Sequence, residues 1–297
     1  MVFLILALLT LQAPAAAAAE APILREIGQF KGTIGVSARN LLTGEEINIK
    51  ADLRFPTAST IKTAIMLEVY HQAAQGRLRL DAPVTLQDRD KVGGSGALNG
   101  LHDGLALTLR DLVHLMIVLS DNTATNMLVA HVGTKNVDER LVAYGLQDTK
   151  LFRPTFRDGR PDVYPELEKE FGLGMTTPRD MAKMMAFIAE GRAVNPEASA
   201  AMFATLRKQQ DRAMIPRLLP DDLEIGNKTG TDEEKAAAAG GVHHHVRADA
   251  AIVTGKNLKY VIAIYTRDVE DTRWTVENDA VTTGARISKL VYDRFSR

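Results

Sequence analysis

Two residues in the stretch FPTASTIK, residues 55–62, have the types and spacing to do chemistry together. Ser59 and Lys62 lie three residues apart, and residues at that spacing share one face of a helix. A serine hydroxyl is a weak nucleophile unless a neighbouring group accepts its proton. A lysine amine accepts one when burial or nearby cations lower its pKa. The pair therefore predicts a nucleophile with its base, although a helix-capping serine beside a solvated lysine has the same spacing.

Two further motifs strengthen the catalytic interpretation. Ser120-Asp121-Asn122 falls between two predicted helices, and Lys228-Thr229-Gly230 ends a predicted strand. In this order, Ser-x-x-Lys, Ser-Asp-Asn and Lys-Thr-Gly are the signature of class A β-lactamases and penicillin-binding proteins. Over nearly all of its length after the first segment, the sequence resembles the class A β-lactamase family of penicillin-recognising serine hydrolases. The stretches GSGALNGLHDG, TTPRDMA and RADAAIV match the family in style.

The resemblance implies a catalytic role for four residues. Ser59 attacks the substrate carbonyl and forms an acyl-enzyme, while Lys62 relays its proton. Ser120 passes a proton toward the leaving nitrogen, and Lys228 holds the Ser120 hydroxyl and supplies positive potential.

The resemblance also implies a substrate-binding set around them. Asn122 binds the substrate's side-chain amide and fixes Lys62, and the backbone N–H groups of Ser59 and Thr231 hold the oxyanion. Thr229, beside Gly230 on the same strand, suits a substrate carboxylate. Arg247 suits the same carboxylate with its bidentate fork, although an ordinary strand-edge arginine is the simpler interpretation.

The loop that should supply a second base departs from the family pattern. Class A enzymes hydrolyse the acyl-enzyme with a loop glutamate followed four residues later by an asparagine. Here the loop reads LFRPTFRDGRPDVYPELEKEFGLGMTTP, and its two plausible registers put Thr155 or Tyr164 at the glutamate position. Another loop acid, with Glu166 as first choice ahead of Glu168 and Glu170, is one expected substitute. Alternatively, Lys62 serves both steps, or water releases the ester poorly; a solvated loop face also explains these acids.

Three functions follow from these residues. The first is β-lactam hydrolysis through an acyl-enzyme on Ser59, with slow or altered deacylation. The second is a penicillin-binding DD-peptidase that acts on peptidoglycan peptides, and the third is an inactive binder of such peptides. Each implies a small-molecule or peptide substrate and no cofactor.

The elements that must position these residues predict an α/β (α+β) fold of the β-lactamase/transpeptidase-like kind. Strands are expected at both ends of the chain: a hairpin over residues 32–49, then strands in LEIGNKTG, RADAAIVT and LKYVIAIYT, followed by a helix over 279–295. Helices are expected at 59–75, after Thr108, after Asn122 and after Thr177. This order predicts an antiparallel sheet built from both termini, with flanking helices and an inserted helical lobe. The site should lie in the cleft between them.

The expected domain organisation is a signal segment followed by one catalytic domain. Residues 1–19 carry no charge and resemble a secretory signal, although they lack a basic start. Residues 20–297 form the catalytic domain, with a sheet lobe at 20–75 and 206–297 and a helical lobe at 76–205. We therefore expect a secreted or periplasmic protein that has no membrane contact once the signal is removed.

Composition excludes several classes of function. The 297 residues carry a net charge of −1, which gives no reason to expect a nucleic-acid partner. The absence of cysteine excludes disulfides, thiol nucleophiles and zinc–cysteine sites. The triplet His243-His244-His245 has no carboxylate partner at metal-binding spacing, so no metal is expected. A monomer is expected.

Overall fold

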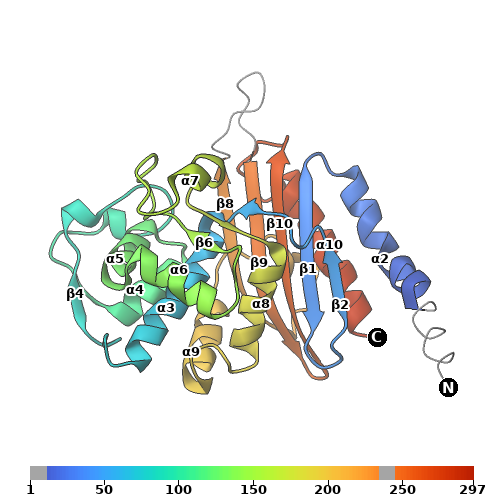
Figure 1. Ribbon diagram of the computed structural model, residues 1–297, viewed down its shortest axis with the longest axis horizontal. Coiled ribbons are helices and arrows are strands. Elements are labelled where there is room, and N and C mark those ends of the chain that lie inside the picture. The colour runs from blue at the N-terminus through green and yellow to red at the C-terminus, as the bar shows by residue number, and fades with distance from the viewer. Residues whose placement is uncertain (1–11, 234–244) are drawn as a thin grey trace.

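The architecture is a five-stranded antiparallel sheet beside a group of helices (Figure 1). The computed structural model describes residues 12–233 and 245–297. The strand order in the sheet is β2-β1-β10-β9-β8, so two strands from the start of the chain pair with three from its end through β1 and β10, and both termini build the sheet as expected. The strands are β1 (Thr33–Asn40), β2 (Glu46–Ile49), β8 (Glu224–Glu233), β9 (His245–Gly255) and β10 (Leu258–Val269).

The two central strands are buried on both faces. Along β10, Tyr260 and Ile262 enter one apolar core, whereas Val261 and Ala263 enter the other. This alternation follows from the two-residue repeat of a strand. It also explains why β10 reads as a continuous apolar run rather than an alternating one.

Helices cover both faces of this sheet. Helix α8 packs on one face, against β1, β9 and β10, while α10 packs on the other and contacts α2. The remaining long helices form the group on the far side of β8, arranged around α3. The helices are α2 (Gln12–Gln29), α3 (Lys62–Ala74), α4 (Leu109–Val118), α5 (Asn122–Val132), α6 (Thr134–Ala143), α7 (Pro165–Phe171), α8 (Pro178–Ala189), α9 (Pro196–Leu206) and α10 (Asp279–Phe295).

Short strands complete the described chain. β3 (Phe55–Pro56), β7 (Gly174–Thr176) and β6 (Lys150–Leu151) form a three-stranded sheet in that order. β4 (Pro83–Thr85) pairs with β5 (Ala106–Thr108). β3 leads into a 3₁₀ turn, Ala58–Ile61, from which α3 continues.

The expected helix starts are confirmed at two caps. The Thr108 hydroxyl accepts a hydrogen bond from the Asp111 N–H at 3.1 Å and begins α4. Thr177 caps α8 in the same way through Asp180, with Pro178 at the first helical position. Both use the side-chain oxygen to satisfy an N–H that the helix leaves without a partner.

Helix α3, expected over residues 59–75, begins at Lys62 and is buried over its first nine residues. Every residue from Lys62 to Tyr70 is buried, because helices surround α3 on several sides. Its buried acid, Glu68, is compensated by Arg140 at 3.0 Å and by the amide of Gln72 at 2.7 Å. A buried charge is tolerated when it is paired and hydrogen-bonded in this way.

The expected signal segment, residues 1–19, lies largely outside the described residues, which begin within it at Gln12. Among the described residues, no helix is both long and apolar enough to span a bilayer.

Gly35 on β1 offers a test of how tightly the sheet packs under α8. A Cβ added there would lie 2.7 Å from the Phe55 ring and 2.8 Å from the Pro178 ring. We expect Gly35→Ala to lower the free energy of unfolding by about 1–3 kcal/mol, because overpacking forces neighbours out of place. Urea denaturation measures the change. Gly28→Ala is the control, since nothing lies within 4 Å of its added Cβ; equal effects of the two substitutions would contradict the prediction.

Candidate active site

Ser59 lies in the 3₁₀ turn before α3, where the backbone is strained. The preceding Ala58 has a left-handed φ of 43°, a conformation that costs a non-glycine residue about 1–3 kcal/mol and is found at functional sites. Strand β8 passes close to this turn at Gly230, where an added Cβ would lie 2.9 Å from the Thr57 carbonyl oxygen. Glycine at this position therefore lets β8 approach the turn that carries Ser59.

Lys62 is fully buried one turn after Ser59. Its amine lies 2.7 Å from both the Ser120 carbonyl oxygen and Asn122 Oδ1, and 3.1 Å from Ser120 Oγ. Burial, followed by the charge of Lys228, holds the pKa of Lys62 well below its ordinary range. A neutral amine keeps two N–H donors, enough for the two carbonyl-type oxygens, and has one lone pair that can accept a proton. This is the state that a general base requires.

Ser120 occupies the turn between α4 and α5 and also has a left-handed φ, of 54°. The next residue, Asp121, caps α5 by accepting from the Ala124 N–H at 2.8 Å. Its other carboxylate oxygen accepts from the N–H groups of Ala97 and Leu98 at 2.7 and 2.9 Å. Asp121 is thus structural, and it ties the loop that carries Ser95 to the turn that carries Ser120.

Lys228 approaches the same hydroxyl from strand β8. Its amine donates to Ser120 Oγ at 3.1 Å and to the Thr229 carbonyl oxygen at 2.7 Å. Burial lowers its pKa to about 8, while the carboxylates of Asp211 and Asp249 oppose the shift. The Ser120 hydroxyl therefore lies between two lysine amines, of which Lys228 is the more fully protonated at neutral pH.

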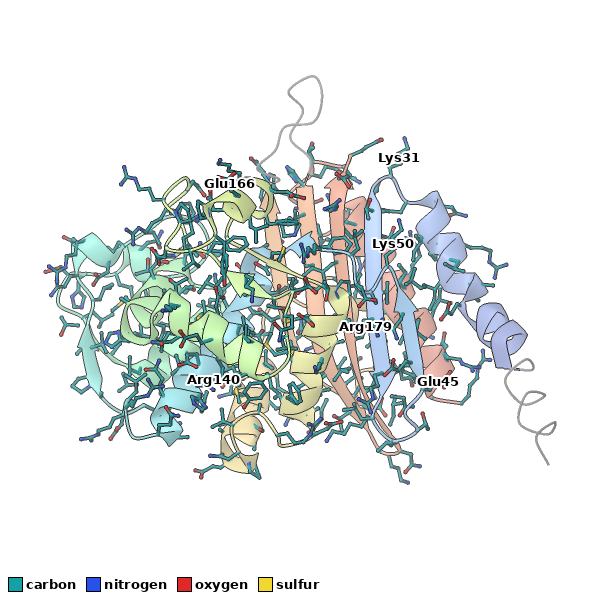
Figure 2. The ribbon with its side chains drawn as sticks, in the orientation of Figure 1. Lys31, Glu45, Lys50, Arg140, Glu166 and Arg179 are labelled. Atoms are coloured by element: carbon teal, nitrogen blue, oxygen red, sulfur yellow. The ribbon has the colours of Figure 1, made fainter. Side chains whose placement is uncertain are left out.

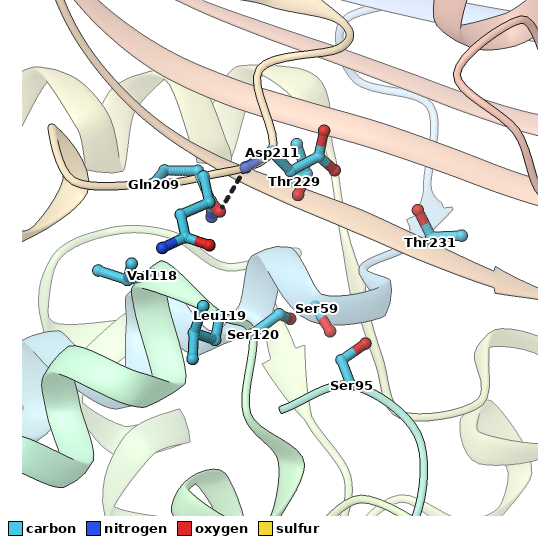
Figure 3. A pocket seen from close by; sticks show the side chains of 10 residues that line it. Ser59, Ser95, Val118, Leu119, Ser120, Gln209, Asp211, Thr229 and Thr231 are labelled. Atoms are coloured by element: carbon cyan, nitrogen blue, oxygen red, sulfur yellow. Dashed lines mark hydrogen bonds between the residues drawn. The ribbon is translucent and has the colours of Figure 1, made fainter. Parts of the chain in front are cut away.

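Two adjoining pockets open beside Ser59. The first, with a volume of about 250 Å³, lies between β8 and the turn after α4 (Figure 3). The second, of about 230 Å³, lies between β8 and the loop after β6. Ser59, Ser95 and Thr231 line both pockets, so a single ligand can occupy the two together.

The expected substrate-binding residues divide into three groups. Thr229 lines the first pocket, Asn122 lines the second and Thr231 lines both. Asn122 also binds Lys62, as expected, while its amide N–H donates to the Gly93 carbonyl at 3.2 Å. Gly230 serves the close approach described above rather than lining either pocket.

Arg247 does not reach the pockets. Its guanidinium donates to the carbonyl oxygens of Val246 and Arg273 and lies 4.9 Å from the centre of the Trp274 ring. The carboxylate-binding role of Arg247 therefore stays a prediction, and in this structure its guanidinium contacts backbone carbonyl oxygens and an aromatic ring instead. Of the histidine triplet, His245 stacks on Trp274 at 4.8 Å, and His243 and His244 lie outside the described residues. Among the described residues, no metal-binding group of three His, Cys, Asp or Glu side chains is present.

The three glutamates of the loop also lie away from Ser59, whereas Asp158 of the same loop lines the second pocket, paired with Arg153. Figure 2 shows Glu166 at the outer surface of α7, where it pairs with Lys169 at 2.9 Å and is 82% exposed. Glu168 is buried against Arg153 at 2.9 Å, and Glu170 lies 3.9 Å from Arg267. None of these three carboxylates lines either pocket, so the structure does not bring the expected substitute base to the site.

Thr155 lines the second pocket together with Ser59. Its hydroxyl donates to Asn126 Oδ1 at 2.9 Å, and its N–H donates to the same oxygen at 2.8 Å. In this structure a neutral threonine therefore stands near the nucleophile, in the position that one of the two loop registers assigns to the glutamate.

Sequence reasoning missed several residues that line the pockets. They come from loops: Ser95, which lies in the stretch GSGALNGLHDG but was given no role, and Phe156, Gln209, Asp211 and Trp274, which lie in no motif. Trp274 offered one signal, since it is the only tryptophan in the chain. Asp211 lies beside Thr229 in Figure 3, and its N–H donates to Gln209 Oε1 at 3.1 Å.

Comparison with known proteins places this chain in a family of enzymes. A family model described as the beta-lactamase enzyme family covers residues 18–295. A beta-lactamase of Amycolatopsis lactamdurans is 27% identical over 207 residues, 68% of this chain and 65% of that protein. Beta-lactamase L2 of Stenotrophomonas maltophilia is 35% identical over 103 residues, 35% of this chain and 34% of that protein. The alignments thus span less than two thirds of the length of either relative.

Solved structures extend the likeness over almost the whole chain. The crystal structure of a beta-lactamase from Sphaerobacter thermophilus is 34% identical, covers 96% of both chains and has a TM-score of 0.76. The structure of PBP-A has a TM-score of 0.78 at 24% identity, over 94% of this chain and 96% of that one. At 24% identity, the likeness to PBP-A supports the fold alone.

The position of Lys62 predicts that Ser59 depends on it for reactivity. We expect Lys62→Arg and Lys62→Met to slow acylation of Ser59 by an activated ester about 10²–10⁴-fold, because neither residue accepts a proton near neutral pH. Intact-protein mass spectrometry measures the rate, and thermal unfolding verifies the fold. Lys169→Arg, a change at an exposed lysine, is the control. Rates within threefold of the unmodified protein would refute a base role for Lys62.

Proposed function

Because the chain belongs to the beta-lactamase enzyme family, we propose that it opens β-lactam rings through an acyl-enzyme on Ser59. The observation that carries this proposal is the Ser120 hydroxyl, held 3.1 Å from the amines of both Lys62 and Lys228. Such a hydroxyl can hand a proton to a leaving nitrogen and recover one from its lysine neighbours.

The proposed acylation proceeds in two proton-coupled steps. Lys62 accepts the proton of Ser59 as Oγ attacks the carbonyl carbon of the ring. The resulting oxyanion is held by the backbone N–H groups of Ser59 and Thr231, and loss of one such donor typically costs about 10²–10³ in rate. Ser120 then protonates the ring nitrogen as the C–N bond breaks, and the proton on Lys62 replaces the one that Ser120 gave up.

The first pocket is proposed to take the substrate's carboxylate. Lys228, buried behind Ser120 and Thr229, supplies positive potential there below its pKa of about 8 and opposes the charge of Asp211 in the lining. The Thr229 and Ser120 hydroxyls supply hydrogen bonds. Because Arg247 is engaged elsewhere, Lys228 is the cation to which we assign this role. The remainder of the substrate then extends past Ser59 into the second pocket.

Release of the acyl group is proposed to be slow. Glu166, Glu168 and Glu170 are paired with basic side chains and do not line the pockets. Thr155, which does line the second pocket, is no base at neutral pH. Asp158, the loop acid that does line this pocket, is paired with Arg153. We therefore assign the activation of water to Lys62, which then serves both half-reactions.

A second candidate function is a penicillin-binding peptidase that cleaves D-Ala-D-Ala peptides. The observation that favours it is the same placement of the loop acids, since a peptidase needs no fast route for hydrolysing a penicilloyl ester. The two candidates share the acyl-enzyme on Ser59 and differ in the lifetime of that ester.

We further propose that the protein is exported through residues 1–19 and acts as a monomer without a cofactor, its two lobes forming one catalytic domain.

The lifetime of the ester gives a test with two variants. We expect benzylpenicillin to leave an adduct on Ser59 that decays slowly, and Glu166→Gln to leave its decay rate within twofold, because that carboxylate is exposed and distant from the pockets. Thr155→Glu should speed the decay by at least about tenfold by adding a base beside Ser59. Intact-mass kinetics measures acylation and decay separately, with Ser59→Ala as the blank. Strong slowing by Glu166→Gln would overturn the assignment.

The pKa of Lys228 gives a pH dependence. Lys228 is protonated below about pH 8 and loses its charge above it. The second-order rate constant for acylation by benzylpenicillin, an anion, should therefore fall about tenfold between pH 7 and pH 9. Lys62 does not cause this fall, because deprotonation activates it. Lys228→Arg should remove the fall, since arginine keeps its charge; an unchanged profile in that variant would contradict the prediction.

A further inference from the structure

Two large aromatic side chains stand exposed at the mouth of the second pocket. Phe156 is 56% exposed and Trp274 is 60% exposed, and both line that pocket together with Ser59. They come from different parts of the chain, the loop between β6 and α7 and the connection between β10 and α10. Exposed aromatic rings that converge on a pocket are characteristic of ligand-binding sites.

Trp274 is held in place from the sheet. The guanidinium of Arg247 lies 4.9 Å from its ring centre, and the ring of His245 lies 4.8 Å away. Arg247 also donates to the carbonyl oxygen of Arg273 at 2.9 Å, which fixes the backbone just before the tryptophan. Stacking and hydrogen bonding to β9 thus orient the indole before any ligand arrives, which lowers the entropy lost on binding.

Phe156 is held in place from the opposite side. It adopts a left-handed φ of 56°, and its ring packs over Gly94. An added Cβ at Gly94 would lie 2.7 Å from both the Phe156 ring and the Asn122 amide nitrogen. The phenylalanine ring therefore lies next to the amide expected to bind the substrate's side-chain amide.

The part of the substrate that reaches these rings follows from the proposed site of the carboxylate, beside Thr229 and in front of the buried Lys228. A β-lactam carries a carboxylate on one side of its reactive carbonyl and an acylamino group on the other. If Lys228 and Thr229 bind the carboxylate in the first pocket, the acylamino group extends past Asn122 into the second. We propose that Phe156 and Trp274 form a subsite for an aromatic ring on this acyl group, so that the protein prefers aryl-substituted β-lactams.

This subsite rests on the proposed function, and a matched pair of substrates tests it. Benzylpenicillin and 6-acetamidopenicillanic acid share the amide and the carboxylate and differ by one phenyl ring. In the unmodified protein, benzylpenicillin should acylate Ser59 about tenfold faster or more. Phe156→Ala and Trp274→Ala should each reduce this ratio about three- to tenfold, the size of an aromatic contact. Val276→Ala, an exposed apolar residue near Trp274 that does not line the pocket, should leave it unchanged.

The tryptophan provides a second readout that needs no change to either ring. Because the chain has one tryptophan, the fluorescence of Ser59→Ala reports on Trp274 alone. Benzylpenicillin should change that emission on binding, and the acetamido compound, at equal occupancy by calorimetry, should not.

The outcomes separate the two levels of the proposal. If neither penicillin acylates Ser59 in the unmodified protein, the proposed function is wrong. If both acylate it at similar rates, or if either alanine substitution leaves the ratio unchanged, the aromatic subsite is wrong while the proposed function stands. Equal fluorescence responses to the two compounds would likewise exclude the subsite.

Discussion

The site depends on the burial of two lysine amines around one serine hydroxyl. Taking ammonium groups out of water is costly, and two of them near the same oxygen repel each other. The surroundings divide the roles: burial and the charge of Lys228 lower the pKa of Lys62, whereas the carboxylates of Asp211 and Asp249 oppose the lowering of the pKa of Lys228. Two residues of the same type thereby become a base and a cation, because their environments move their protonation apart.

Three distant segments must meet for this arrangement to exist. Lys62 comes from α3, Ser120 from the turn between α4 and α5, and Lys228 from β8. Ala58 and Ser120 adopt strained left-handed backbone conformations where these segments come together. Glycine at position 230 is also required, because a Cβ there would lie too close to the Thr57 carbonyl oxygen. The cores on both faces of β9 and β10, together with the buried helix α3, hold these segments in place.

The sequence predicted what depends on local patterns. The strands of the sheet, the caps Thr108 and Thr177 and the helix at 279–295 follow from periodicity and capping chemistry. The motifs identified Ser59, Lys62, Ser120 and Lys228, because a short motif on a helix, turn or strand fixes the direction of its own side chains.

The structure departs from the expectations where contacts between distant parts of the chain determine the position of a side chain. Arg247 matched a chemical type, but its direction depends on Trp274 and Arg273, far along the chain. Glu166 was chosen from a loop whose course no periodicity fixes, and its pairing with Lys169 holds it at the surface. Phe156 and Asp211 lie in loops as well, so their convergence on the pockets is a property of the tertiary structure. The 3₁₀ start of α3 was missed because the left-handed φ of Ala58 leaves no trace in composition.

The shared contacts of Asp121 limit how the sequence around the site can vary during evolution. One carboxylate begins the helix after Ser120 and also carries the loop of Ala97 and Leu98, which flanks both pockets. Substitutions in that loop should therefore also shift the turn that carries Ser120. Selection for a change in ligand preference there is coupled to selection on the rate of turnover. The opposite rim, with Trp274, is anchored to β9 through Arg247 and is separate from that turn. Variation that broadens the range of ligands while sparing the reaction should accumulate on the Trp274 side.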